Sequence, residues 1–116
     1  MWIFTQQGFI SITASENNPA SLMVQSRFQG HIEALFPTAQ VTEAPYGRYR
    51  FRAAVQRRVV SKTLDDIVEH IDYFTFKNSI PGELYREAVV DAWSTLNKHD
   101  LGPGKPHDPG PEELMP

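Results

Sequence analysis

The sequence predicts an α+β fold in which four or five antiparallel strands form one sheet with helices on one of its faces. Two observations lead to this prediction. Before residue 57, short segments alternate apolar and polar residues with a period of two, as in strands that bury one face. After residue 57, apolar residues recur every three or four positions, as in amphipathic helices. A chain of 116 residues is long enough to fold around one core of its own.

The first two strands are expected at residues 2–5 and 9–14, joined by a glycine-containing turn at 6–8. In the second of these strands, Ile10 and Ile12 share one face. Phe9, Ser11 and Thr13 lie on the other face. This pattern is typical of a strand that is buried on one side only.

After a turn that ends at Pro19, residues 21–28 alternate again, which predicts that Leu22, Val24 and Phe28 point inward and Arg27 outward. A short helix is then expected over 29–36, because Pro37 cannot continue it. A brief strand at 41–44 and a turn at 45–47 follow.

The segment 48–55 has the clearest alternation in the chain. Its apolar set points into the core, and comprises Tyr49, Phe51, Ala53 and Val55. The other face carries a row of arginines, Arg48, Arg50 and Arg52. The sequence therefore predicts a half-buried strand with a basic outer row.

Two helices complete the predicted order. The first spans about 57–71, and its apolar stripe is Val60, Leu64, Ile67, Ile71 and Phe74. After the break at Pro81-Gly82, the second spans 83–98, with acidic residues near its start as a helix N-terminus prefers. Its stripe is Tyr85, Val89, Trp93 and Leu96.

Without the first strand, this order is β-β-α-β-β-α followed by an extra C-terminal helix. A ferredoxin-like βαββαβ unit acquires that order when its last strand is moved to the front. The strands 21–28 and 48–55 are then central neighbours, and their outward residues gather on one surface with Phe9. The set is Phe9, Met23, Gln25, Arg27, Arg48, Arg50 and Arg52.

We expect one domain over residues 1–99 and a disordered, acidic tail rich in Gly and Pro over 100–116. Charge is segregated along the chain, because residues 27–62 carry a net charge of +5 and residues 63–99 carry −4. Residues 1–99 are thus neutral overall, unlike a dedicated nucleic-acid-binding domain, which is usually basic throughout.

Several function classes find no support in the sequence. The absence of cysteine excludes disulfides, thiolate metal sites and cysteine nucleophiles. Asp66 and His70 have helical spacing, but two ligands do not make a metal site. No catalytic motif is present, so we expect no cofactor, no metal and no enzymatic activity. The N-terminal segment resembles neither a signal peptide nor a membrane span, which favours a cytoplasmic protein without a membrane partner.

The connection between the two helices combines aromatic and polar residues, and allows two interpretations. Asp72 and Tyr73 could meet a ligand, with Lys77 as its cation. Alternatively, Asp72 bonds to the local backbone or to Lys77, and the aromatics fill the gap between helices and sheet. We favour the second interpretation, because most such polar groups serve hydrogen-bond closure.

The chain resembles a group of small bacterial proteins that have no assigned activity. The resemblance rests on Met1-Trp2-Ile3-Phe4-Thr5 with Gly8-Phe9 and Ser11, on Ile71-Asp72-Tyr73 with Phe76-Lys77, and on a closing helix with Tyr85 and Trp93. It runs from Met1 to about Leu96. It implies that Asp72, Tyr73, Phe76 and Lys77 are a feature of the group, and it implies no activity.

Two functional hypotheses follow. The favoured one is a protein-interaction or structural module that is homodimeric or binds another protein, in which the arginine row meets acidic groups of a partner or of a second copy. The alternative is binding of nucleic acid or another anionic ligand by Arg27, Arg48, Arg50 and Arg52, with Phe9 as the one exposed aromatic side chain available to stack on a base.

Overall fold

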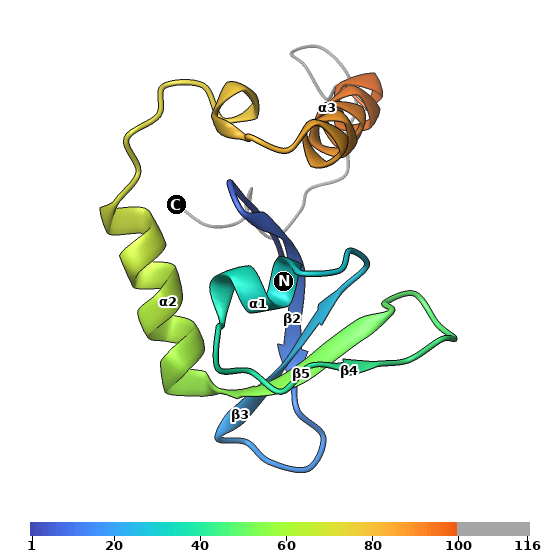
Figure 1. Ribbon diagram of the computed structural model, residues 1–116, viewed down its shortest axis with the longest axis vertical. Helices are drawn as coiled ribbons and strands as arrows, with labels where there is room; N and C mark the ends of the chain where they lie inside the picture. The colour runs from blue at the N-terminus through green and yellow to red at the C-terminus, as the bar shows by residue number, and fades with distance from the viewer. Residues whose placement is uncertain (100–116) are drawn as a thin grey trace.

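The computed structural model describes residues 1–99, so the predicted tail lies outside the described residues. Five antiparallel strands form one open sheet in the order β1-β2-β3-β5-β4, which confirms the predicted α+β class (Figure 1). The strands are β1 (Trp2–Thr5), β2 (Gly8–Ala14), β3 (Ser21–Ser26), β4 (Thr42–Glu43) and β5 (Phe51–Gln56). The helices are α1 (His31–Leu35), α2 (Arg57–Glu69), the short 3-10 helix η1 (Lys77–Ser79) and α3 (Glu83–Lys98).

The strand order places β3 beside β5, as the permuted ferredoxin-like arrangement requires. That arrangement itself stays a prediction. None of the helices in residues 1–99 has both the length and the apolar character needed to cross a membrane.

One face of the sheet carries the main core. The strands contribute Ile10, Ile12, Val24, Phe51, Ala53 and Val55. The helical side contributes Ile32, Leu35, Phe36 and Val60. Alternation along β2, β3 and β5 thus places their apolar residues on the face that α1 and α2 cover.

The third strand is shorter than expected. It ends at Ser26, whose hydroxyl accepts a hydrogen bond from the Phe28 N–H at 3.2 Å and donates to the Phe9 carbonyl at 3.1 Å. These bonds turn the chain before Phe28. The prediction that Phe28 points into the main core is therefore wrong, and its ring lies against His31 at 4.9 Å between centroids.

The arginine strand also begins later than predicted. The strand β5 starts at Phe51, and Arg48 lies in the bend before it. Gly47 in this bend has φ of 111°, a conformation that residues with a side chain rarely adopt, so the ladder cannot extend regularly through the turn.

The apolar stripe of α2 is shorter than its periodicity suggested. Val60 is buried and Leu64 and Ile67 pack on the core, whereas Ile71 and Phe74 are exposed. The helix ends at Glu69, so the residues beyond it no longer follow the helical stripe. The connection to α3 then passes over the tip of the β1–β2 hairpin in Figure 1.

The helix α3 has the predicted bounds, but only part of its stripe is buried. Tyr85 and Val89 form a second, smaller cluster with Ile80, against which Phe9 and Phe76 pack. Trp93 and Leu96, in the C-terminal half of the stripe, are about two-thirds exposed. The prediction that Trp93 and Leu96 are buried is therefore wrong for a single copy of the chain, because no described residues cover these side chains completely.

Candidate functional site

The arginine end is the name we give to the end of β3 and β5 that carries Arg27, Arg48, Arg50 and Arg52. Gln25 lies opposite Arg52, and the last pair of this ladder is Ser26 with Phe51. Arg27 directly follows this pair in the chain and Arg50 directly precedes it. The structure therefore brings Arg27, Arg50 and Arg52 to one end of the sheet, while Arg48 lies in the exposed bend.

These arginines are not equally available to a ligand. Two nitrogens of Arg50, Nη2 and Nε, lie 2.7 and 2.8 Å from Glu43 Oε1, and both side chains are more than half exposed. The Arg52 Nε is buried and has no hydrogen-bond partner among the described residues. Arg27 and Arg48 are exposed. The arginine end thus presents three cations that no described carboxylate neutralises.

Phe9 is not the exposed stacking platform that the sequence suggested. Its ring is half-buried and stacks on Phe4 with centroids 4.4 Å apart, and Trp2 meets its edge at 6.1 Å. It belongs to an aromatic row on β1 and β2, because the register places Phe4 opposite Phe9 and Trp2 opposite Ser11. An aromatic ring that is already covered on one side offers little surface to a base.

In the connection between α2 and η1, residues 1–99 show neither the ligand pocket of the first interpretation nor the Asp72 bonds of the favoured one. Asp72 and Lys77 are exposed, and neither side chain takes part in a hydrogen bond or ion pair within residues 1–99. Tyr73 is half-buried beside Phe76, with ring centroids 5.7 Å apart. Phe76 packs on the small cluster of Tyr85 and Val89, so aromatic packing holds this connection.

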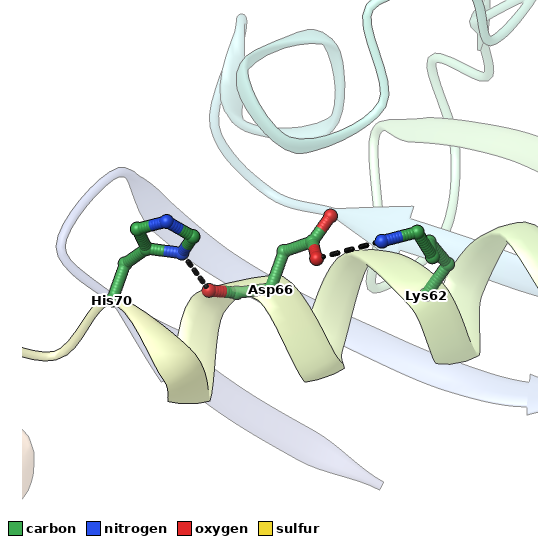
Figure 2. A network of polar contacts seen from close by, with 3 residues as sticks. All are labelled: Lys62, Asp66 and His70. Carbon is green, nitrogen blue, oxygen red and sulfur yellow. Dashed lines mark hydrogen bonds and ion pairs between the residues drawn. The ribbon is translucent and has the colours of Figure 1, made fainter.

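Asp66 lies on α2 and His70 directly follows the last residue of that helix, as shown in Figure 2. The His70 Nδ1 is 2.7 Å from the backbone carbonyl of Asp66, so it donates a hydrogen bond to that carbonyl. The Asp66 carboxylate accepts a bond from Lys62 Nζ at 2.9 Å, and this bond raises the pKa of the lysine. Among residues 1–99, no three His, Asp or Glu side chains are grouped closely enough to hold a metal ion.

An exposed apolar groove is a feature that the sequence did not reveal. It has a volume of about 610 Å³ and runs between β1, the segment before η1, and α3. We call it the apolar groove. Its lining is Trp2, Ile3, Phe4, Thr75, Phe76, Lys77, Val89, Val90, Ala92, Trp93 and Leu96.

Large apolar side chains in the groove remain in contact with water. Trp2 is 69% exposed, Trp93 is 65% exposed and Leu96 is 66% exposed. Lys77 is the one charged residue of the lining. Large contiguous exposed apolar surfaces rimmed by polar residues often mark interaction sites.

A buried polar cluster at the tip of the β1–β2 hairpin positions α3, and so shapes the groove. The Tyr85 hydroxyl donates a hydrogen bond of 2.7 Å to the Thr5 carbonyl. The Phe9 N–H donates to His31 Nδ1 at 3.0 Å, which requires a neutral imidazole. His31 meets the Tyr85 ring edge-to-face at 4.8 Å, so one histidine contacts β2 and α3.

Burial perturbs both titratable groups of this cluster. It lowers the pKa of His31 below its ordinary value of 6.5, because the charged imidazolium loses solvation. It raises the pKa of Tyr85 well above its ordinary value of 10. Sequence reasoning missed His31, although its place between Gly30 and Ile32, at the start of a short helix with buried Ile32 and Leu35, was a signal of a packed ring.

No family model matches the chain, and comparison with curated proteins and with solved structures finds no significant match. The resemblance to the group of small bacterial proteins stays a prediction. The geometry of the groove and of the arginine end must therefore carry the functional argument.

Proposed function

We propose that this chain is a protein-interaction module that pairs with a second copy of itself through the apolar groove. The observation that carries the proposal is the stripe of α3, which is buried at Tyr85 and Val89 and continues uncovered at Trp93 and Leu96. A helix stripe usually faces a hydrophobic partner over its whole length. A second copy supplies the apolar surface that covers Trp93 and Leu96.

The size of the uncovered surface supports a protein partner. From their exposed fractions, Trp2, Phe4, Val90, Trp93 and Leu96 together leave roughly 500 Å² of apolar side chain in contact with water in and around the groove. Each partner of a standard interface buries about 800 Å², of which somewhat more than half is apolar. The area that these five side chains expose thus matches the apolar share of one side of a standard interface.

The rim of the groove favours a second copy over an unrelated protein. Beside the groove, Lys77 and Arg86 lie in one shallow hollow with Glu87 and Asp91. In a twofold interface each patch meets the same patch of the other copy, so a rim that carries both signs can pair with itself. An unrelated protein would instead need its own arrangement of positive and negative charges that matches this rim.

Sedimentation velocity over a range of concentrations tests the proposal, with two matched leucine variants of α3. Leu96 lines the groove, whereas Leu84 is 82% exposed on the same helix outside it. We expect a concentration-dependent dimer that persists at high salt. Leu96→Asp should weaken dimerisation about 100-fold, because it places a charge in an apolar interface, and Leu84→Asp should change it less than about threefold.

Two results would contradict the proposal. One is a monomer at every concentration. The other is equal weakening by the two leucine variants. A dimer that dissociates at high salt would instead assign the contact to charged groups such as the arginine end.

A second candidate function is supported by the arginine end, where no described carboxylate pairs with the exposed Arg27 and Arg48, and Arg52 lies close to Arg27 along the ladder. Exposed guanidinium groups of this kind suit the phosphates of a single-stranded nucleic acid. Fluorescence anisotropy with a mixed-sequence oligonucleotide at low salt tests it. Arg27→Glu should abolish binding and Arg58→Glu, on α2, should leave most of it; no binding by the wild-type chain would exclude this function.

A further inference from the structure

The strand β1 is the edge of the sheet, and its backbone polar groups can be assigned to one side or the other. Met1 and Ile12 exchange two hydrogen bonds, from Met1 N to Ile12 O at 2.7 Å and from Ile12 N to Met1 O at 2.8 Å. In an antiparallel ladder, hydrogen-bonded and non-hydrogen-bonded pairs alternate. The register therefore directs the N–H and C=O of Ile3 toward β2, and those of Trp2 and Phe4 away from it.

The contacts of Phe9, the residue opposite Phe4, agree with this assignment. The Phe9 N–H donates to His31 Nδ1 and its carbonyl accepts a bond from Ser26 Oγ. Both groups thus point away from β1. Trp2 and Phe4 are left with two N–H and two C=O groups on the free edge, which no described residue pairs.

This edge lacks the features that normally protect a free strand. Natural edge strands carry charged residues, proline or a bulge that prevent pairing with another chain. The strand Trp2-Ile3-Phe4-Thr5 carries none of these, and its ladder with β2 is regular. Its residues Trp2, Ile3 and Phe4 all line the apolar groove, so the groove follows the free edge.

We infer that β1 of one copy pairs antiparallel with β1 of the second copy, so that the two sheets become continuous across a twofold axis at Ile3. This inference rests on the proposed self-association and states how the two copies meet. Strand addition at an exposed edge is a common mode of protein recognition, in which the backbone supplies hydrogen bonds and alternate side chains supply specificity.

The free groups select the register. With Trp2 of one copy opposite Phe4 of the other, both outward residues of each strand form hydrogen-bonded pairs, and all their free N–H and C=O groups are used. Pairing Trp2 with Trp2, or Phe4 with Phe4, uses only half of them. In the selected register Ile3 faces Ile3 in a non-hydrogen-bonded pair, with Cα atoms roughly 4.5 Å apart.

The side chains fit the same register. Trp2 and Phe4 lie on the sheet face that also carries Phe9, so pairing extends this aromatic row from one copy into the other. Cross-strand aromatic pairs stabilise antiparallel ladders. Trp93 and Leu96 line the groove beside this edge and would cover the added strand.

Amide hydrogen exchange on the wild-type chain tests the inference directly. The Trp2 and Phe4 amides should exchange about tenfold or more slowly at concentrations that favour the dimer than at concentrations that favour the monomer. The Ile3 amide, which is already bonded within the hairpin, is the internal control and should change much less.

Disulfide trapping tests the register. The chain contains no cysteine, so Ile3→Cys introduces a single thiol at the expected twofold axis. Facing residues of a non-hydrogen-bonded pair lie within disulfide range, so mild oxidation should yield a covalent dimer. Ala54→Cys, at an exposed position on β5, should stay monomeric on a non-reducing gel.

The outcomes separate this inference from the proposed function. A dimer by sedimentation whose Trp2 and Phe4 amides remain unprotected, and whose Ile3→Cys variant is not trapped, overturns the β1 pairing and leaves self-association through the groove intact. A chain that stays monomeric overturns both the proposed self-association and the β1 pairing. The free edge of β1 would then be a candidate for pairing with an extended segment of a different protein. Protection together with trapping supports the inference.

Discussion

The surroundings of β3 and those of β1 differ in how completely apolar residues are covered. Val24 on β3 and Ile32 on α1 have no exposed surface, because helices cover this part of the sheet. Trp2 on β1 and Trp93 on α3 stay about two-thirds exposed, although they continue equally regular patterns. The chain therefore completes one core by itself and leaves a second one open at the sheet edge.

The largest expected effect is the difference in the free energy of unfolding between a variant of the closed core and a variant of the open one. Ile32→Ala should lower the free energy of unfolding by about 3 kcal/mol, since it removes buried methylene groups and leaves a cavity. Val90→Ala, in the groove, should lower it by less than about 0.5 kcal/mol. Urea unfolding at concentrations below dimerisation measures both values. Equal losses would mean that the groove is part of the monomer's core.

A second pair of variants tests the packing that attaches the closed core to the open one. At Gly8, an added Cβ would lie 2.6 Å from His31 Cγ, so Gly8→Ala must displace the imidazole or the hairpin. We expect it to cost about 2 kcal/mol in urea unfolding. Gly82→Ala is the matched control, because nothing lies within 4 Å of its added Cβ and its φ is −81°. This control should change stability by less than about 0.5 kcal/mol, and equal effects at both positions would contradict the close packing of His31.

The smallest expected effect concerns pH. His31 has a lower pKa in the folded chain than the value of about 6.5 expected when unfolded, so the unfolded state binds more protons between these two values. The contribution of neutral His31 to stability is therefore complete above about pH 6.5 and is lost as the pH falls toward the folded-state pKa. Urea unfolding between pH 5 and 7.5 should show this decrease.

The control for the pH effect is His31→Gln. The Gln amide oxygen can accept the Phe9 N–H bond without titrating. This variant should lack the part of the decrease that belongs to His31. An unchanged pH profile would show that His31 does not carry the effect.

The closed core could be predicted from the sequence because its signals are local. Alternation identified Ile10, Ile12 and Val24 as inward residues, and the three-to-four spacing placed Val60 on the buried side of α2. A one-residue shift in the pairing register of a strand would turn all its apolar side chains toward water. The alternation therefore fixes which face of the strand is buried. The pattern does not fix where each strand begins and ends. Ser26 ends β3 early and Gly47 delays the start of β5, because both act through turn geometry, which periodicity does not report.

The groove could not be predicted because its lining comes from three distant segments of the chain. The stripe of α3 correctly identified one apolar face, but periodicity does not tell whether the chain provides a cover for it. Trp93 and Leu96 were expected inside for that reason. The arginine end was easier to find, since three of its four arginines lie within one short segment. Its partial neutralisation by Glu43 depends on how β4 pairs with β5.

The most direct measurement of the central claim is tryptophan emission as a function of protein concentration. The chain has two tryptophans, Trp2 and Trp93, and both line the groove. If a second copy closes the groove, the emission maximum should move to shorter wavelength as concentration rises, with the same midpoint as dimer formation in sedimentation. Emission that stays constant while the chain associates would place the contact elsewhere and contradict the account.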